Sequence, residues 1–242
     1  MFQIQNLSVS IEKKSILSGI EYTFEQGKTY FILGQNGSGK SSLALALMGH
    51  PKYRVDTGRI ILDGVDITEL PPDERNRNGL FLSFQSVPEI RGVRLAEYLR
   101  TIYNKSLPVG TKALSPFVFR RFIASYLAEL SISEAFLDRD LNVGFSGGEK
   151  RKMEILQMKL LSPKYILLDE IESGLDVDAF RMVAELLVRI KTPENTLVII
   201  THDVRTLDYL TPDEALVIEA GRIKVRGGKE LVERIMQEGF GV

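Results

Sequence analysis

The feature that most constrains the fold is a glycine-rich string set between two apolar segments. The string consists of Gly34, Gln35, Asn36, Gly37, Ser38, Gly39, Lys40, Ser41 and Ser42. The apolar run 29–33 before it predicts a buried strand, and the run 41–48 after it predicts a helix. Glycines let a backbone wrap closely round an anion, and the helix N-terminus adds a partial positive charge. The string therefore predicts a polyphosphate-binding loop, because an ordinary glycine-rich turn would not need this order of strand, loop and helix.

The spacing within the string gives roles to two of its side chains. It fits Gly-x-x-x-x-Gly-Lys-Ser, in which the lysine reaches the β- and γ-phosphates of a nucleotide. We expect Lys40 to do so here, and we expect the Ser41 hydroxyl to ligate Mg²⁺. The loop thus predicts ATP and Mg²⁺ as ligands.

A pair of acids at the end of an apolar run is a second candidate for chemistry. Residues 165–168 predict a central strand of a parallel sheet, and Asp169 and Glu170 follow it directly. Successive side chains diverge at a strand end, so the two acids can have different tasks. We expect Asp169 to orient Mg²⁺, and Glu170 to polarise the attacking water and accept its proton. A solvated acidic turn is the alternative, which the phosphate-binding loop elsewhere in the chain makes the weaker one.

Strand and helix patterns alternate over much of the chain. Strands are predicted at 2–10, 19–24, 29–33, 59–62, 80–84, 165–168 and 196–200, with a polar turn at 71–75. Helices are predicted at 41–48, from 94 to 137 with a break at 104–116, from 148 and from 176; a strand pair ending at 223–225 and a helix follow. This alternation predicts an α/β fold with a largely parallel sheet covered on both faces. The helical stretch near 90–145 predicts a smaller lobe.

Composition excludes several classes of function. The 242 residues carry a net charge of −1, which gives no general attraction to nucleic acid or to anionic lipid. The absence of cysteine rules out disulfides and thiolate chemistry within this sequence. The longest apolar runs are far shorter than the ~20 residues of a membrane-spanning helix, and the first residues do not resemble a secretory signal. We expect a cytoplasmic protein with no nucleic-acid partner and no direct membrane insertion.

A third candidate element follows Phe145 and consists of Ser146, Gly147, Gly148 and Glu149. A hydroxyl and glycine amides at the start of a helix bind phosphate well, yet the chain already has a phosphate-binding loop. The string resembles the signature of the ATP-binding-cassette (ABC) ATPases, in which it covers the ATP that a second cassette holds. The resemblance implies an ATP-dependent, head-to-tail dimer of two cassettes.

Further positions match the ABC ATPases in the order of that family. Gln85 resembles the Q-loop glutamine that contacts Mg²⁺ and senses the nucleotide, and His202 resembles the switch histidine. The segment from Ser173 to Asp176 resembles the D-loop. The resemblance implies Mg-dependent ATP hydrolysis with Lys40, Glu170 and His202 as catalytic residues and with Ser41, Gln85 and Asp169 around the metal.

The resemblance also implies the architecture. It predicts a single ABC ATPase domain over 1–242, with the P-loop NTPase fold of ABC type and a mixed, mainly parallel core sheet. The catalytic core is expected at about 1–85 and 160–242, with an antiparallel β subdomain. A helical subdomain is expected at about 86–159.

Within the ABC ATPases, three strings resemble the SufC group, the ATPase subunits of the SUF iron–sulfur cluster assembly machinery. They are residues 82–93, 144–154 and 169–176. The resemblance implies SufB/SufD-like scaffold proteins that grip the surface around 85–98, and ATP hydrolysis that changes the scaffold's conformation. A nucleotide-binding subunit of an ABC transporter is the alternative. A regulatory module that binds ATP with little turnover is disfavoured by the complete set of catalytic residues.

Two departures carry expectations of their own. Ile11 falls near the position where many ABC cassettes place an aromatic residue that stacks on adenine, so base selectivity is open. Lys150, Arg151 and Lys152 put three cations into the first turn of a helix, where the helix dipole disfavours them. A phosphate in the dimer, Glu170 in the isolated subunit, and solvent are the three alternatives that would compensate these charges.

Overall fold

The computed structural model describes residues 1–202 and 204–240, which form two compact units. The first unit comprises Met1–Gln85 and Pro163–Ser173 together with the described part of Lys191–Val242. The second comprises Ser86–Ser162 and Gly174–Ile190. The family resemblance implied that residues 174–190 belong to the catalytic core, whereas their contacts group them with the second unit. None of the helices in the described part of the chain combines the length and hydrophobicity that crossing a bilayer requires.

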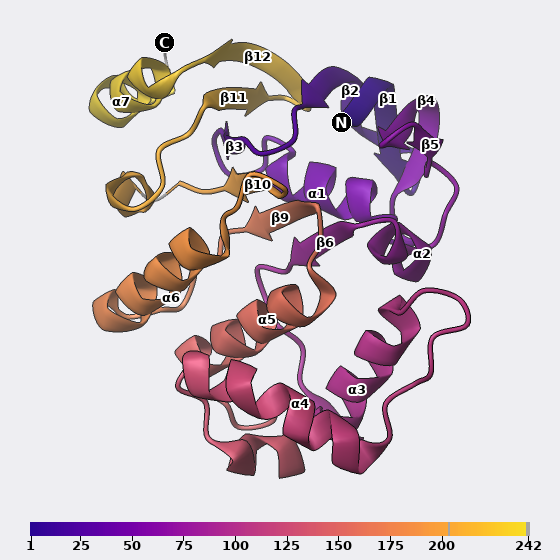
Figure 1. Ribbon diagram of the computed structural model, residues 1–242. Helices are drawn as coiled ribbons and strands as arrows, with labels where there is room; N and C mark the ends of the chain where they lie inside the picture. The colour runs from indigo at the N-terminus through magenta and orange to yellow at the C-terminus, as the bar shows by residue number, and fades with distance from the viewer. Residues whose placement is uncertain (203, 241–242) are drawn as a thin grey trace. The chain divides into compact units, whose positions relative to one another are not determined.

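A six-stranded sheet forms the centre of the first unit (Figure 1). Its order is β12 (Arg222–Gly227), β11 (Glu214–Glu219), β3 (Thr29–Leu33), β10 (Thr196–Ile200), β9 (Tyr165–Asp169) and β6 (Leu80–Ser83). All pairs are parallel except β11 with β12. Every residue of β3, β6, β9 and β10 is buried, as expected for continuous apolar runs in a covered parallel sheet. The predicted α/β class, with its mixed sheet, is confirmed.

A four-stranded antiparallel sheet completes the strands of this unit. Its order is β2 (Lys14–Phe24), β1 (Phe2–Ile11), β4 (Arg54–Leu62) and β5 (Val65–Asp66). The predicted strands 19–24 and 59–62 were each too short, because β2 begins at Lys14 and β4 at Arg54. The missed residues are mostly polar and exposed, and pairing with β1 makes them strand despite their weak local signal.

Helix α1 (Lys40–Met48) lies between the two sheets and contacts β2 and β4 of one and β6 and β9 of the other (Figure 1). Its buried apolar side chains, Leu43, Ala44, Ala46 and Leu47, lie within a single core with residues of both sheets. A helix that is apolar on most sides suits this sandwiched position. The helix that presents its N-terminus to the phosphate-binding loop is therefore held by the main core.

Two further α-helices also belong to the first unit. Helix α2 (Pro72–Arg77) replaces the polar turn predicted at 71–75, which was wrong. Pro72 at the first helical position, acids in the first turn and arginines in the last turn are all helix-favouring signals. Helix α7 (Lys229–Glu238) packs against β11 and β12.

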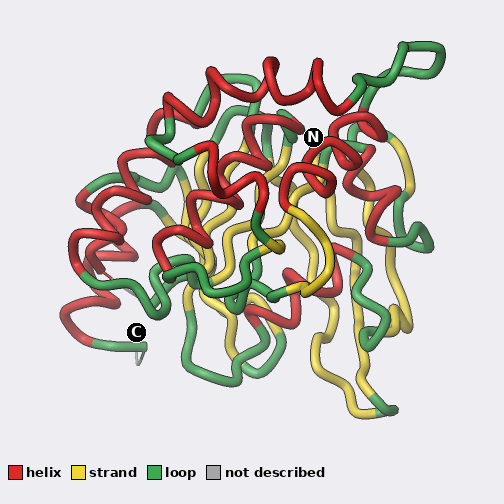
Figure 2. The backbone as a smooth tube through the Cα atoms, turned by 90° about the horizontal axis from the view of Figure 1, so that it is seen from below, coloured by secondary structure: helices red, strands yellow, loops and turns green. Residues whose placement is uncertain are grey.

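The second unit is mostly helical (Figure 2). It contains α3 (Leu95–Ser106), α4 (Pro116–Glu129), α5 (Gly147–Leu161) and α6 (Val177–Ile190), together with the short pair β7 (Ile90–Arg94) and β8 (Asp140–Leu141). Ser115 caps α4, and Pro116 opens that helix, which explains why the chain breaks between α3 and α4. The helix and loop pattern expected between 94 and 137 is present, and β7 is an addition that pairing with β8 creates.

Candidate functional site

The glycine-rich string forms a loop between β3 and α1, and its backbone explains its glycines. Gly34, Gly37 and Gly39 all have positive φ, at 149°, 80° and 111°. A Cβ at Gly34 would lie 2.3 Å from the Ile218 carbonyl oxygen, so any larger residue would clash there. The buried Ser38 hydroxyl has no hydrogen-bond partner within the described residues. The loop therefore offers an unsatisfied polar group and helix-start amides to an anion.

Lys40 supplies the positive charge of this loop. Its Nζ donates to the carbonyl oxygens of Gly34 (2.9 Å) and Gln35 (3.0 Å), and the side chain is buried. Burial lowers the pKa of Lys40, while Glu170 and Asp169 oppose that shift. The ammonium group thus lies against the loop that a polyphosphate would occupy. The negative charge of a phosphate there would offset the free-energy cost of removing the ammonium group from water.

Asp169 and Ser41 face each other from β9 and α1. The Ser41 hydroxyl donates to Asp169 Oδ1 at 3.0 Å, and Asp169 is buried. Burial raises the pKa of Asp169 to about 6; the hydrogen bond from Ser41 and the nearby Lys40 oppose this, and the charge of Glu170 adds to it. A carboxylate buried beside a second acid, with a hydroxyl in contact, is a site that a cation would stabilise.

These residues fit Mg²⁺. The described residues hold no group of three His, Cys, Asp or Glu side chains, so ligands beyond Asp169 and the Ser41 hydroxyl would have to be phosphate oxygens, an amide or water. Mg²⁺ binds in this way in nucleotide sites, where it retains waters and uses few protein ligands. When bound, Mg²⁺ neutralises charge on the phosphates and fixes their orientation.

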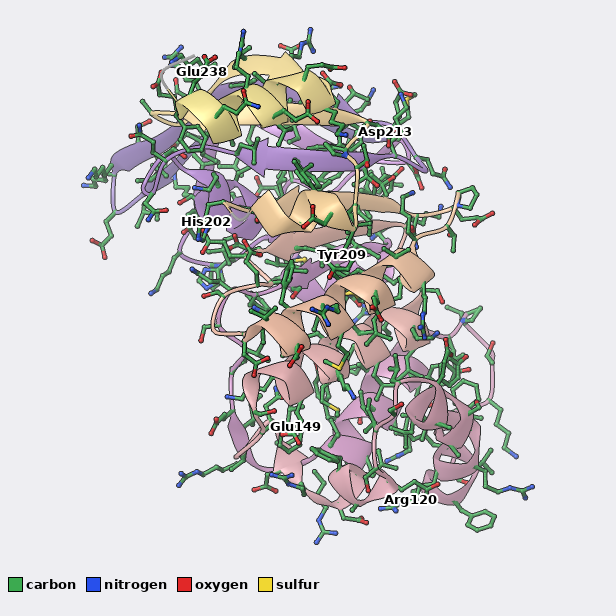
Figure 3. The ribbon with its side chains drawn as sticks, turned by 90° about the vertical axis from the view of Figure 1, so that its left-hand side faces the viewer. Arg120, Glu149, His202, Tyr209, Asp213 and Glu238 are labelled. Atoms are coloured by element: carbon green, nitrogen blue, oxygen red, sulfur yellow. The ribbon has the colours of Figure 1, made fainter. Side chains whose placement is uncertain are left out.

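Glu170 is joined to two of the other predicted residues. Gln85 Nε2 donates to Glu170 Oε2 at 2.6 Å, and His202 Nδ1 lies 3.4 Å from Glu170 Oε1. The Glu170 side chain is buried, whereas the His202 side chain is 55% exposed and follows β10 (Figure 3). The structure therefore brings Lys40, Glu170 and His202 together with Gln85 at the carboxyl ends of neighbouring strands. The carboxylate can accept a proton, and an amide oxygen such as that of Gln85 is a type of group that can ligate a cation.

The backbone of Glu170 is unusual. Its φ is 45°, in the left-handed region that is costly for a residue with a side chain. The Glu170 N–H donates to the Ile200 carbonyl at 2.9 Å, and the Ser173 N–H donates to the Glu170 carbonyl at 3.0 Å. These bonds hold the turn after β9 in a conformation that aims the carboxylate at Gln85 and His202.

In the second unit, Ser146 and Glu149 form a capping box at the start of α5. The Ser146 hydroxyl accepts from the Glu149 N–H at 3.3 Å, and the Glu149 carboxylate accepts from the Ser146 N–H at 2.7 Å. Glu149 lies on the first turn of this helix (Figure 3). The sequence contains the signal for a capping box, Ser-x-x-Glu before a helix, but the sequence analysis assigned these residues to phosphate binding and did not predict the cap.

Packing explains the two glycines of the signature. A Cβ at Gly147 would lie 3.1 Å from the Gly174 carbonyl oxygen, and one at Gly148 would lie 3.3 Å from Ala179 Cβ. Neither glycine has a positive φ, so close approach to the chain at 174–182 is the reason for them. Asp176 of the predicted D-loop accepts from the Ala179 N–H at 2.8 Å and so caps α6.

The three cations at the start of α5 have partners within the second unit. Lys150 Nζ lies 2.8 Å from Glu89 Oε1, Arg151 forms a buried pair with Glu154 at 2.6 Å, and Lys152 donates to the Ser131 carbonyl at 3.3 Å. Glu89 and Glu154 are anions that sequence reasoning did not consider. The role suggested for Glu170 as a partner of these cations stays a prediction.

Comparison with known proteins assigns the family. A family model described as "ABC transporter" matches residues 17–173. The chain belongs to this ABC family. It is therefore an ABC-type ATPase that binds and hydrolyses ATP with Mg²⁺.

Relatives extend the likeness over nearly the whole chain. A probable ATP-dependent transporter, ycf16, of Antithamnion sp. is 41% identical over 241 residues, which cover 99% of this chain and 96% of the relative. A probable ABC transporter ATP-binding protein of Streptococcus pyogenes is 44% identical over 243 residues, covering 99% and 93%. The dimeric ATP-binding cassette MJ0796, solved with ADP and Pi, aligns with a TM-score of 0.79 at 19% identity, covering 95% of this chain and 99% of that one. At that identity it supports the fold alone.

Proposed function

We propose that this ATPase drives a conformational change of an iron–sulfur cluster assembly scaffold, with SufB/SufD-like proteins as partners. One structural observation supports the proposal in addition to the three sequence strings. The segment 88–94 is exposed and contacts the start of α5, the helix that begins at the signature residues. All five residues of β7 are exposed, including the apolar Ile90 and Val93. Exposed apolar side chains on a short edge strand suit a partner surface.

An ion pair and two hydrogen bonds connect this segment to α5, to β8 and to the residue that follows β8. Glu89 pairs with Lys150, the Asn142 side chain donates to the Pro88 carbonyl at 2.9 Å, and the Gly92 N–H donates to Asp140 at 2.9 Å. A partner bound to β7 would therefore move the start of α5 with it. Hydrolysis at the ATP site would change the partner's position through the same contacts.

We assign the chemistry to residues of the first unit. Lys40 would hold the terminal phosphates, and Ser41 and Asp169 would hold Mg²⁺, which neutralises charge on the phosphates. Glu170 orients a water molecule and accepts its proton as the water oxygen bonds to the γ-phosphorus; the bond from that phosphorus to the β,γ-bridging oxygen breaks, and ADP and phosphate are released. His202 and Gln85 position the Glu170 carboxylate through the contacts described above. A change in the position of Gln85 when nucleotide binds would also move the chain segment that follows it.

The proposal includes a dimer. Two copies would pair head to tail, so that Ser146, Gly147 and Gly148 of one chain cover the ATP held by the other. The MJ0796 cassette, which has the same fold, is dimeric in its structure with ADP and Pi. In such a dimer the Ser146 hydroxyl would donate its O–H to a phosphate oxygen while its oxygen still accepts from the Glu149 N–H, and the dipole of α5 also favours the phosphate.

A nucleotide-binding subunit of a membrane transporter is the second candidate. The names of the two relatives favour it, because both describe ATP-dependent or ABC transporters. In that case β7 and the chain before it would receive a cytoplasmic segment of a membrane-spanning protein.

Affinity capture separates the two candidates. A tagged chain is purified from its native cells, and its partners and their iron content are measured. Recovery of water-soluble scaffold proteins that bind iron supports the proposal, whereas recovery only with membrane-spanning chains overturns it. Ile90→Asp should abolish capture of the scaffold and leave nucleotide binding by the isolated chain unchanged. Val188→Asp, which alters an equally exposed valine on α6, is the control that should retain capture.

A further inference from the structure

The stretch from Tyr98 to Ala128 in the second unit contains no acidic residue. The nearest acids along the chain are Glu97 and Glu129, at its two ends. Five cations lie within the stretch: Arg100, Lys105, Lys112, Arg120 and Arg121. The stretch covers most of α3, the loop after it and nearly all of α4. The chain as a whole has a net charge of −1, so its overall composition hides this local excess of positive charge.

Three of these cations form no ion pair with any described residue. They are Lys105 at the end of α3, Lys112 in the loop and Arg121 of α4, and all three are exposed. Arg120 pairs with Asp138, and both side chains of that pair are about half exposed. Exposed cations without a partner in their own chain leave their charge available to an anionic surface.

Apolar side chains project from the same region. Val109 is 108% exposed, Phe117 is 70% exposed and Val118 is 47% exposed. Val109 is thus as open to solvent as it would be in an extended chain. Single exposed apolar residues are ordinary on protein surfaces, but these three lie within residues 109–118 and beside unpaired cations.

Hydrogen bonds fix the loop that joins α3 to α4 at the edge of the second unit (Figure 1). Asn104 Nδ2 donates to the Leu114 carbonyl at 3.1 Å, and the Leu114 N–H donates to Asn104 Oδ1 at 2.8 Å. This pair closes the loop and holds the end of α3 beside the start of α4. The Thr111 N–H donates to the Pro108 carbonyl at 3.0 Å, which places Val109 in a tight turn at the tip of the loop.

Helix α4 carries Phe117, Val118 and Arg121 on its exposed side. Residues three and four apart lie on the same side of a helix, so Arg121 is next to both apolar residues. The other side of the helix is buried through Phe119 and Ile123. Helix α4 therefore has apolar residues on two sides, and packing within the chain accounts for only one of them.

This combination of charge and apolar side chains fits the surface of an anionic lipid bilayer. Lys and Arg are attracted to the negative potential of such a surface. Projecting apolar side chains can enter the boundary between headgroups and acyl chains, which needs no preformed pocket to receive them. An acidic protein would match the cations equally well, but a fully exposed valine at a loop tip would then require a complementary pocket on that protein.

We propose that the loop–helix surface binds an anionic membrane peripherally. The loop–helix surface is defined by Lys105, Val109, Lys112, Phe117, Val118 and Arg121. Few cations and few apolar side chains take part, so the binding is weak and reversible and weakens as salt screens the charges. The proposal depends neither on the identity of a protein partner nor on ATP hydrolysis, and it holds for both functional candidates.

Flotation of the full chain with lipid vesicles tests the proposal. Vesicles of phosphatidylcholine with added phosphatidylglycerol should bind the wild type at low salt, and vesicles of phosphatidylcholine alone should not. Lys112→Gln and Arg121→Gln should each weaken binding by about 5-fold, and Phe117→Ser by about 10-fold. The controls are the exposed Lys14→Gln of β2 and the exposed Val188→Ser of α6, which should both retain binding.

A fluorescence measurement reports on the environment of Phe117 directly, because the chain has no tryptophan. Phe117→Trp introduces a single indole at the proposed contact. Its emission should shift to shorter wavelength with phosphatidylglycerol-containing vesicles and should be quenched when their acyl chains are brominated. It should stay unchanged with phosphatidylcholine vesicles and with polyglutamate, which supplies negative charge without a bilayer.

Four results would overturn the proposal. Absence of binding to anionic vesicles at low salt excludes a membrane contact, and binding that survives all three substitutions places the contact elsewhere. Binding of polyglutamate without binding of vesicles identifies an acidic protein as the partner. A wild type that self-associates in sedimentation, with Phe117→Ser remaining monomeric, identifies a second copy of the chain as the occupant. Thermal unfolding of each variant checks that the fold is retained.

Discussion

Glu170 combines a buried carboxylate, two side-chain neighbours and a left-handed backbone. A non-glycine residue in this region costs on the order of 1 kcal/mol or more, and the surrounding hydrogen bonds must over-determine it. The Ile200 carbonyl and the Ser173 amide do so here. The strained backbone of Glu170 therefore orients the carboxylate of the candidate base at a cost in folding stability.

Replacing Glu170 with Gln tests its role as the base. The amide keeps the size of the side chain and loses the ability to take a proton, so turnover should fall by about 10²–10⁴-fold. ATP affinity should stay within a few-fold of the wild type, because Lys40 and the loop are intact. Steady-state ATPase assays and equilibrium nucleotide binding measure the two quantities. Turnover equal to that of the wild type would contradict the role of Glu170 as the base.

Asp63 is a second residue whose charge has structural consequences. It accepts hydrogen bonds from the Met1 ammonium group (2.6 Å), Lys164 (2.7 Å) and the Tyr165 hydroxyl (2.8 Å). Burial alone would raise the pKa of Asp63, but the bonds from these three donors outweigh it and hold the pKa well below the ordinary 3.8. Folding therefore favours the ionised form of this carboxylate.

The pH dependence of stability follows from this direction. Because the folded pKa is depressed, the stabilisation by Asp63 is present above pH 3.8 and is lost as pH falls through the folded pKa. Asp63→Asn should lower the urea midpoint at pH 7, and its difference from the wild type should shrink below about pH 4. Urea unfolding between pH 7 and pH 3 measures it, with the exposed Asp73→Asn as control. A difference that does not vary with pH would contradict this account.

At the scale of elements, the C-terminal end of α1 depends on one side chain of α2. The Arg75 guanidinium is buried and donates to the carbonyl oxygens of Ala46 (3.0 Å) and Leu47 (2.7 Å). It also donates to the carbonyls of Leu70 and Thr68 in the preceding turn. Burial lowers the pKa of Arg75 to about 10, with Glu69 opposing the shift, so the group stays charged at neutral pH. Arg75 thus supplies a donor to the Leu47 carbonyl at the end of α1 and adds a second donor to the Ala46 carbonyl, which also accepts from the Gly49 N–H.

Removing this cap should destabilise the first unit. In Arg75→Met the chain length is similar but buried carbonyls lose their donor, which costs about 1–3 kcal/mol for an unsatisfied buried group. Thermal unfolding of the full chain measures the loss. Arg77→Met is the matched control on the same helix, where an exposed pair with Asp73 is worth less than about 1 kcal/mol. Equal losses of stability in the two variants would show that the hydrogen bonds of Arg75 to α1 do not stabilise the first unit.

At the scale of the whole molecule, the chain carries the phosphate loop and the signature on two different compact units. The dimer proposal predicts that each complete ATP site takes its loop from one chain and its signature from the other. Closure would then require association, which couples hydrolysis to the state of both chains.

Mixing two inactive variants tests this arrangement. Lys40→Ala removes the loop's cation, and Ser146→Arg blocks the signature, so each homodimer should be inactive. A heterodimer has one intact composite site, so a 1:1 mixture should regain about a quarter of wild-type turnover if the chains pair at random. ATPase activity of the mixture measures it. A mixture as inactive as its components would contradict sites shared between chains.

Much of the site could be predicted from sequence because its chemistry depends on local order along the chain. A strand, a glycine-rich turn and a helix are short-range features, and Gly34 to Ser41 specify a phosphate loop with little help from elsewhere. Asp169 and Glu170 likewise follow an apolar strand directly. The α/β class followed from the same alternation.

Tertiary structure alone decided how separate segments meet. Lys14 begins β2 because pairing with β1 outweighs a weak local signal. Arg75 reaches the end of α1 from 28 and 29 residues away. Hydrogen bonds and ring contacts between distant segments leave no periodic pattern in the chain. The sequence thus determined which chemical groups are present and their local order, and the packed structure determined their partners.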